Sequence, residues 1–77
     1  MNEYVEWLII WFKKKNPKII LELEENYINS GVIDSLGIIE LVEDIEEAFN
    51  INFNQSNLQD RRFSSINGLA KIILEIK

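Results

Sequence analysis

The chain has 77 residues, of which 47% are hydrophobic and 27% charged, and its formal net charge is −5. These proportions are typical of one small globular domain, here residues 1–77, and unlike those of a disordered chain. The absence of cysteine and histidine excludes disulfides, thiolate or imidazole metal ligands, and the Ser-His-Asp and Cys-His arrangements of hydrolases. The acidic balance also makes nucleic acid a poor partner, because phosphate backbones repel an acidic surface.

The first expected helix covers residues 3–15, with Asn2 as its N-cap. Its apolar residues have the spacing of one helix face, and an aromatic stripe widens that face. The face contains Val5, Leu8, Ile9 and Phe12, with Tyr4, Trp7 and Trp11 beside it. The run from Lys13 to Lys15 favours a helix C-terminus, where the helix dipole attracts cations, and Pro17 ends the helix. The apolar stretch "VEWLIIWF" is far shorter than the roughly 20 residues that a membrane span needs, so we expect no span.

Residues 18–34 do not keep a helical period, and the sequence "NSG" within them indicates a turn. The apolar residues at 19–23 have no second clear strand with which to pair. We therefore expect a long ordered loop, a kind of segment that is uncommon and often functional. Six apolar side chains should fix it to the core, namely Ile19, Leu21, Leu23, Tyr27, Val32 and Ile33.

The clearest helical pattern runs from Ser35 to Asn50, where Asn50 and Asn52 end it. Its buried face should consist of Leu41, Val42, Ile45 and Phe49, and its other faces carry Glu40, Glu43, Asp44, Glu46 and Glu47. Leu36 and Ile39 lie away from the centre of the buried face, close to the acids. Such a surface suits docking to basic partner proteins. An ordinary solvated face is the alternative.

The stretch "SNLQ" at 56–59 predicts a capping box, with Ser56 as N-cap and Gln59 reaching back. A short helix should follow and end near Phe63. Ser64 or Ser65 should then cap a last helix that buries Leu69, Ile72, Ile73 and Ile76. Arg61 and Arg62 form a local basic spot that bears on partner choice, or are plain solvated arginines. The expected fold is an all-α bundle of three main helices plus one short helix.

Asp34 and Ser35 precede the clearest helix, and either is a good N-cap. No residue in the chain is an obvious general base for the serine hydroxyl, and no calcium-loop pattern is present. We therefore expect neither catalysis by this chain alone nor a metal site. Gly37 costs about 1 kcal/mol relative to alanine in a helix, but it leaves room beside Ser35 for a bulky group or a close partner. A tolerated glycine near a fraying helix end is the alternative.

The stretch "SGVIDSLGIIELVEDIEEAF" at 30–49 resembles the phosphopantetheine attachment region of acyl carrier proteins and peptidyl carrier domains. The resemblance extends along nearly the whole chain. It includes the order and size of the helices, the long loop, the Asp-Ser-Leu sequence and the acidic second helix. Asp-Ser-Leu alone is a weak signal, and its combination with the other features is what makes the match specific.

The resemblance implies an acyl-carrier-like fold in which the hydroxyl of Ser35 takes 4′-phosphopantetheine from coenzyme A. A separate phosphopantetheinyl transferase would perform this reaction, and Asp34 would be the neighbouring acid of the motif. The arm would hold an acyl or aminoacyl group as a thioester. Partner enzymes, namely an acyl-loading ligase or synthase and acyltransferases, would contact Leu36, Ile39, Glu40, Glu43 and Glu47.

Carriers of bulk fatty-acid synthesis usually have an acid at the position of Gly37. The resemblance is therefore closer to specialised-pathway, peptidyl or D-alanyl carriers. From these arguments we expect a stand-alone, monomeric, cytoplasmic carrier that is not an enzyme. The alternative is a small helical protein–protein interaction module in which Ser35 is only a helix N-cap.

Overall fold

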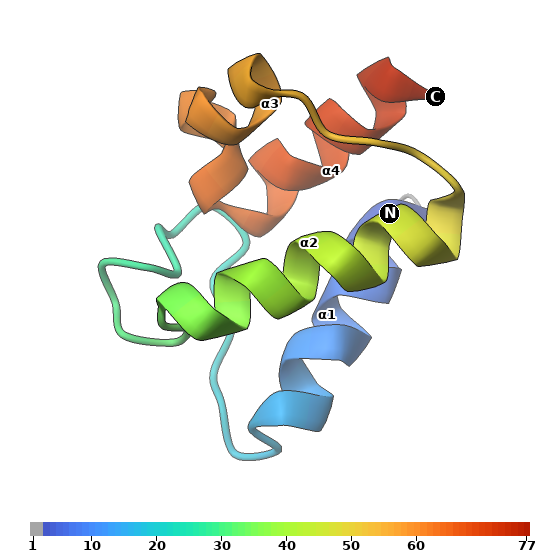
Figure 1. Cartoon of the computed structure of the whole chain (residues 1–77). Coiled ribbons are helices and arrows are strands. Elements are labelled where there is room, and N and C mark those ends of the chain that lie inside the picture. Colours follow the sequence, from blue (N-terminus) through green and yellow to red (C-terminus); the bar gives the residue numbers. More distant parts are fainter. Residues whose placement is uncertain (1–2) are drawn as a thin grey trace.

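The computed structural model describes residues 3–77, so the N-cap predicted at Asn2 lies outside the described residues. Within this range the chain is helical and has no strand, which confirms the all-α prediction. The elements are α1 (Glu3–Lys15), α2 (Ser35–Phe49), α3 (Gln55–Gln59), the 3-10 helix η1 (Arg61–Ser64) and α4 (Ile66–Ile76). Residues 16–34 form the long connection between α1 and α2 (Figure 1).

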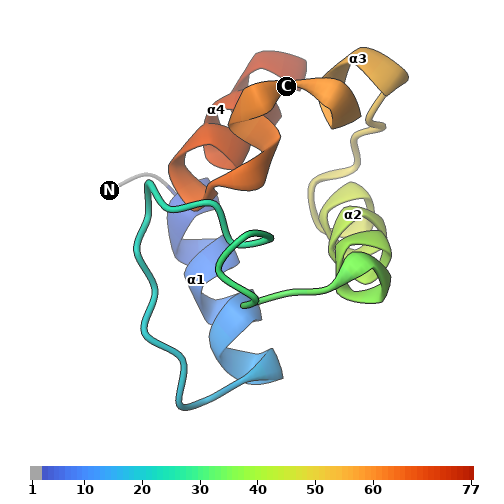
Figure 2. The same ribbon diagram turned by 90° about the vertical axis from the view of Figure 1, so that its left-hand side faces the viewer.

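The three main helices are arranged so that α1 packs directly against α4 while α2 crosses α1 (Figure 1). In Figure 2, α2 is seen nearly along its axis, with its first turn joined to the connection that runs past α1. The start of α2 is therefore held beside α1 at the surface of the bundle.

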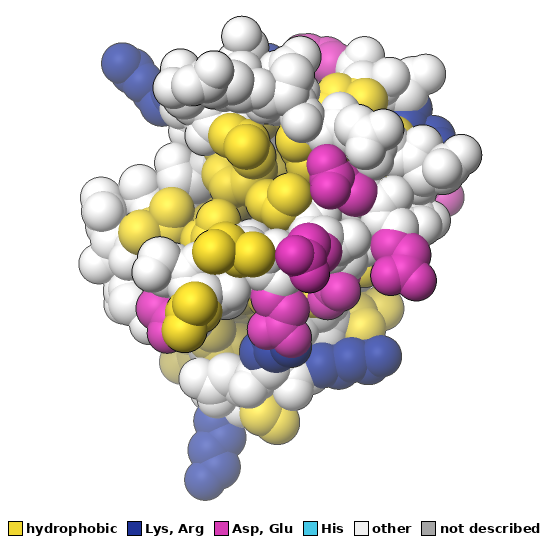
Figure 3. Space-filling model, viewed as in Figure 1, with side chains coloured by type: hydrophobic (Ala, Val, Ile, Leu, Met, Phe, Trp, Pro, Cys, Tyr) yellow, Lys and Arg dark blue, Asp and Glu magenta, His cyan; other side chains and the backbone are white. Residues whose placement is uncertain are grey.

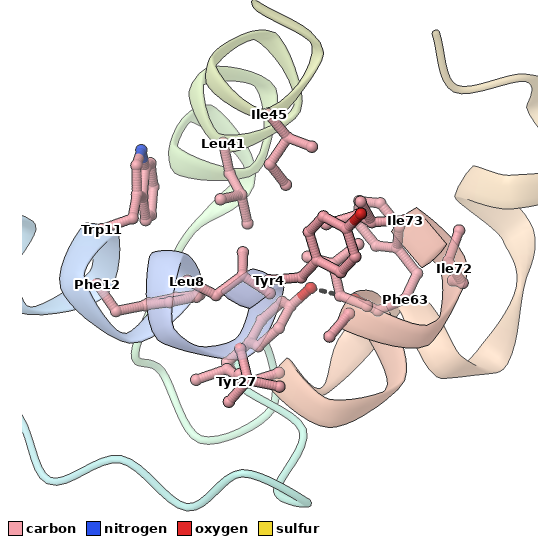
Figure 4. Close-up of a cluster of buried hydrophobic side chains, with 14 of the residues drawn as sticks. Tyr4, Leu8, Trp11, Phe12, Tyr27, Leu41, Ile45, Phe63, Ile72 and Ile73 are labelled. Carbon is pink, nitrogen blue, oxygen red and sulfur yellow. Dashed lines mark hydrogen bonds between the residues drawn. The ribbon is translucent and has the colours of Figure 1, made fainter. Parts of the chain in front are cut away.

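Each main helix contributes the apolar face that its sequence predicts, as Figure 4 shows for part of the core. The fully buried aliphatic side chains include Leu8 from α1, Leu41 and Ile45 from α2, and Leu69, Ile72 and Ile73 from α4. Val42, Phe49 and Ile76 are half-buried against this core. Burial of a large aliphatic side chain contributes about 1.5–3 kcal/mol, so these contacts supply the main stabilising term.

The long connection is fixed to the core largely as expected. Tyr27 and Ile33 are buried, and Leu21, Leu23 and Val32 pack half-buried against the core. Ile19 is half-buried outside this cluster, and Ile20 beside it is 84% exposed.

Backbone hydrogen bonds also tie the connection to the C-terminal part of the chain. The N–H of Tyr27 donates to the carbonyl of Ser64 at 3.0 Å, and the N–H of Asn67 donates to the carbonyl of Leu23 at 3.0 Å. The hydroxyl of Tyr27 donates to the carbonyl of Phe63 (Figure 4). Burial raises the pKa of this phenol, so it stays a neutral donor across the physiological range.

The prediction for the short helix was wrong in two respects. Its capping box is formed by Asn54 and Asn57, whose side chains each accept the other's backbone N–H, and not by Ser56 and Gln59. The helix also ends at Gln59, because Asp60 is extended and its carboxylate accepts the N–H of Arg62 to begin η1.

The last helix begins at the N-cap Ser65, one of the two serines proposed. Its Gly68 lies so close to η1 that a Cβ there would be 2.1 Å from the carbonyl oxygen of Arg62. The guanidinium of Arg62 in turn pairs with Asp60 at 2.9 Å and with Glu75 at 2.6 Å. Arg62 is therefore an internal tie between η1 and α4, and of the predicted basic spot only Arg61 is an exposed arginine.

Candidate functional site

Ser35 is the first residue of α2, and Asp34 is the N-cap of that helix. The Asp34 Oδ1 atom accepts the backbone N–H of Gly37 at 2.8 Å, which satisfies one of the N–H groups that a helix start leaves unpaired. Ser35 is exposed, and its hydroxyl makes no hydrogen bond to any residue within 3–77. The N-cap role, open between the two residues in the sequence, thus belongs to Asp34, and the hydroxyl of Ser35 is available for chemistry.

Gly37 serves packing in a way that the sequence did not indicate. A Cβ at this position would lie 2.6 Å from Cγ1 of Ile33, which is a buried core side chain. Ile33 therefore takes the space that a Cβ at Gly37 would fill, but Gly37 also lines a pocket of about 290 Å³, so the expectation of room at this glycine is supported in part. The glycine allows the chain before Ser35 to pack tightly onto the first turn of α2.

Several acids of α2 are engaged inside the molecule. Glu40, predicted to contact partners, forms an ion pair with Lys15 at the end of α1. Asp44 accepts the indole N–H of Trp11 at 2.7 Å, and Glu46 accepts the backbone N–H of Phe53 at 2.9 Å. All three contacts hold the acidic helix to its neighbours, and the one to Lys15 also offsets a negative charge.

All five predicted partner positions are exposed, and Glu40 is the one among them that is paired within the molecule. Leu36 is 75% exposed and Ile39 is 57% exposed. Glu43 and Glu47 are exposed and form no ion pair or hydrogen bond within the described residues, apart from bonds of the helix backbone. On the face that carries α2, Figure 3 shows hydrophobic side chains directly beside acidic ones. This combination favours an apolar contact surrounded by complementary charge.

The surroundings of Ser35 contain no catalytic machinery. The chain has no histidine, and the described residues hold no cluster of acids that could bind a metal ion. In addition, none of the helices in the described range is long and apolar enough to cross a membrane.

The comparison with protein families identifies the class of protein that this arrangement defines. A model for the phosphopantetheine attachment site matches residues 14–73, which include all of α2. The chain belongs to this phosphopantetheine-binding family of carrier domains. Its prosthetic group is covalently attached 4′-phosphopantetheine, and its role is that of a non-catalytic carrier served by a phosphopantetheinyl transferase and other enzymes. The comparisons with curated proteins and with solved structures found no significant match.

The residues at the start of α2 fit the prosthetic group. Ser35 offers an exposed hydroxyl whose modification breaks no internal hydrogen bond. The partial positive charge at the N-terminus of α2 favours a phosphate at this position. The side chain that caps the helix belongs to Asp34, so a group attached to Ser35 would leave the helix start intact.

Proposed function

We propose that this chain is an acyl carrier that bears its phosphopantetheine arm on Ser35 and tethers an acyl or aminoacyl group as a thioester. The observation that carries the proposal is the uncommitted, exposed hydroxyl at the first residue of α2, within the segment matched by the family. A tethered thioester has a high effective concentration at any enzyme that docks beside it, which is the advantage of a carrier.

The attachment step is a phosphoryl-group transfer from coenzyme A. The hydroxyl oxygen of Ser35 attacks the phosphorus that bears pantetheine, and the pyrophosphate bond of coenzyme A breaks to release adenosine 3′,5′-bisphosphate. The proton of the hydroxyl goes to a base of the transferase. Because this reaction consumes coenzyme A, we propose that the carrier is primed in the cytoplasm.

The proposed docking surface consists of Leu36, Ile39, Glu43 and Glu47, with Glu40 at its edge because that acid already pairs with Lys15. Exposed carboxylates raise the rate of encounter with basic partners and are screened by salt. The apolar pair supplies contact energy once the partner has docked. The partners are the transferase, an acyl-loading ligase or synthase, and acyltransferases, each binding briefly to a monomeric carrier.

The glycine after Asp-Ser-Leu supports a specialised pathway over bulk fatty-acid synthesis. Gly37 resembles the residue of peptidyl and D-alanyl carriers at this position, and in this chain it has a packing role against Ile33. An aminoacyl cargo would require an adenylating ligase as the loading partner.

The proposal is tested by intact mass after incubation with coenzyme A, magnesium and a broad-specificity phosphopantetheinyl transferase. We expect the natural chain to gain one phosphopantetheine, the Ser35→Ala variant to gain none, and the Ser56→Ala variant to react like the natural chain. Ser56 is a matched control because it too is an exposed serine in the first turn of a helix.

Absence of any mass gain, with the transferase active on a control carrier, would favour the alternative of a helical interaction module. A gain that persists in Ser35→Ala would assign the arm to another residue. Both results contradict the proposal.

A further inference from the structure

Half of the basic side chains of this acidic protein are gathered at the C-terminal end of α1 and the start of the connection. Four of the eight lysines and arginines fall within six residues. They are Lys13, Lys14, Lys15 and Lys18, and the first acid after them is Glu22. Figure 1 shows this segment at the lower end of the molecule, where Figure 3 shows basic side chains. The cations are thus concentrated at one end of the fold.

Three of these lysines are not used inside the molecule. Lys15 forms the ion pair with Glu40. The other three are exposed, and their ammonium groups form no ion pair or hydrogen bond within residues 3–77; they belong to Lys13, Lys14 and Lys18. The helix dipole accounts for cations in the last turn of α1, but Lys18 lies outside that helix. Three ammonium groups are therefore available to an external anion.

Aliphatic side chains lie among these lysines. A groove of about 400 Å³ lies between α1 and the connection, and it is lined by Ile9, Lys13, Ile19, Ile20, Leu21 and Leu23. Ile20 is 84% exposed, more than any other large hydrophobic side chain in the described range, and Ile10 on α1 is 56% exposed. The name basic end is used below for the surface formed by Ile10, Lys13, Lys14, Lys18, Ile19 and Ile20.

The exposed position of Ile20 is set by the backbone on both sides of it. The N–H of Ile19 donates to the carbonyl of Asn16 at 3.1 Å, which holds the turn after α1. The carbonyl of Leu23 accepts the N–H of Asn67 at 3.0 Å, which ties the connection to α4. Ile20 lies between these two fixed points and outside the core cluster. Apolar material that covers this side chain removes it from water, which is favourable.

The residue types at the basic end favour a lipid surface over a protein. Protein interfaces are enriched in aromatic residues, methionine and arginine and are depleted in lysine. The basic end has lysine as its cation and isoleucine as its apolar residue. An anionic lipid surface attracts lysine clusters and takes up aliphatic side chains below its headgroups. Lysine stems can lie along that apolar layer while their ammonium groups stay in water.

The acids of α2 leave the aliphatic groove free of negative charge. Glu40 is paired with Lys15. Glu47 lines a separate groove together with Lys14. The aliphatic groove, in contrast, has Lys13 as its one charged residue. The net charge of −5 acts from farther away, and beyond the Debye length of about 8 Å at physiological salt it is largely screened.

We propose that the basic end docks the protein on an anionic lipid surface, with its isoleucines below the headgroups and its lysines paired with lipid phosphates. The contact is peripheral and reversible, because it uses a few side chains and no spanning segment. The inference goes beyond the proposed carrier function and does not depend on attachment at Ser35. It brings the carrier to enzymes that act at such a surface.

The test measures binding of the natural chain, without an arm, to sucrose-loaded vesicles by sedimentation. Vesicles of phosphatidylglycerol mixed with phosphatidylcholine are compared with vesicles of phosphatidylcholine alone. We expect binding to the anionic vesicles to be at least about tenfold stronger and to weaken as salt is added.

Two pairs of substitutions with the same change in net charge locate the contact. Each lysine near an anionic surface strengthens binding about fivefold, so Lys13→Gln with Lys18→Gln should weaken it about 20-fold. Arg61→Gln with Lys71→Gln changes two exposed cations elsewhere and should leave binding within about twofold of the natural chain.

A second comparison tests the apolar contact. Ile20→Ser should weaken vesicle binding about tenfold, because it removes the aliphatic side chain that enters the lipid. Leu74→Ser, at a 58% exposed position on α4, should bind like the natural chain. Circular dichroism checks that these exposed substitutions leave the fold unchanged.

Equal binding to the two kinds of vesicle, or equal losses in the two charge-matched pairs, overturns the proposal. Absence of binding to any vesicle overturns it as well. If the chain then binds poly-L-glutamate, and Lys13→Gln with Lys18→Gln abolishes that binding, the basic end belongs to an acidic protein partner instead. The carrier function is tested separately by the mass gain at Ser35, so its failure and the failure of lipid docking are distinguishable.

Discussion

The indole N–H of Trp11 donates a 2.7 Å hydrogen bond to the carboxylate of Asp44, which joins α1 to α2 at the crossing of the two helices. Trp11 is buried, whereas Trp7 is half-buried and packs on Phe49 with ring centroids 5.4 Å apart. Both tryptophans thus make aromatic contacts within the molecule. Trp11 helps to set where α2, and with it Ser35, lies on the bundle.

Replacement of Trp11 by phenylalanine should therefore destabilise the fold. The variant keeps an aromatic ring but loses a hydrogen bond to a charged group, and we expect a loss of about 1–2 kcal/mol in the free energy of unfolding. Urea denaturation followed by circular dichroism measures it. The matched variant Trp7→Phe loses no such hydrogen bond to a carboxylate, so its free energy of unfolding should fall by less. An equal fall in both variants would contradict this role for the indole N–H.

Asp34 and Ser35 should respond differently to alanine. Asp34→Ala removes the N-cap of α2 and should cost about 1 kcal/mol of stability. Ser35→Ala removes a hydroxyl without a partner and should change stability by less than about 0.5 kcal/mol. Denaturant titration of both variants checks the assignment, which fails if Ser35→Ala is the more damaging change.

Gly68→Ala should destabilise the protein although alanine is the better helix former. At an open helix position the substitution gains up to about 1 kcal/mol. Here the new Cβ would meet the backbone of Arg62, so we expect a loss of about 1–3 kcal/mol from overpacking. Gly37→Ala is the comparison, because its new Cβ meets the side chain of Ile33, which can move, and its loss should be smaller. Thermal unfolding ranks the two variants.

The cluster around Arg62 should make stability depend on pH. Hydrogen bonds from this guanidinium lower the pKa of the Glu75 carboxyl and that of the Asp60 carboxyl. Carboxyls whose pKa is lower in the folded state stabilise the fold above their unfolded values of about 4 and lose that contribution as the pH falls through the lowered values. The natural chain should be more stable than Arg62→Gln at pH 7, with a difference that shrinks below about pH 4.

Urea titrations from pH 3 to pH 7 measure this difference. Arg61→Gln, which changes the exposed neighbouring arginine, should show no such dependence. A difference between the natural chain and Arg62→Gln that stays constant over the whole range would argue against the ion pairs as its source.

The exposed leucine after Ser35 should matter to partners and not to the fold. Leu36→Ala should lower kcat/KM of the phosphopantetheinyl transferase by about tenfold, as expected for an apolar anchor at the centre of an interface. Leu74→Ala is the control, because Leu74 is 58% exposed and lies on α4. Initial rates at varied carrier concentration separate the two variants, and equal rates would remove Leu36 from the docking surface.

Much of this fold can be predicted from the sequence. The spacing of Leu41 and Ile45 predicts the buried face of α2, and the bounds of α1 agree with the residues predicted. Such patterns are local, because a helix face repeats every three to four residues. The exposure of Leu36 and Ile39 follows from the same periodicity.

The features that the sequence did not reveal depend on contacts between distant segments or on competing local signals. The sequence predicts a helix end at Lys15 and a partner contact at Glu40. It does not predict their ion pair, because that pair requires the crossing of α1 and α2. At the short helix, "NQSN" and "SNLQ" offer rival caps, and the asparagine pair prevails. The signal available in the sequence was Asn54 itself. An asparagine can serve as an N-cap, and this one accepts the backbone N–H of Asn57.

The hydrogen bonds that hold the long connection in place also affect the folding rate. Tyr27 and Phe63, joined by the phenolic hydroxyl, are 36 residues apart, and Glu24 and Asn67, joined by another side-chain hydrogen bond, are 43 residues apart. Contacts of such sequence separation require a large loop to close before they form, which slows folding relative to helical bundles held by local contacts. The packing of α1 against α4 spans an even larger part of the chain, so we infer that the position of Ser35 becomes fixed only once these non-local contacts have formed.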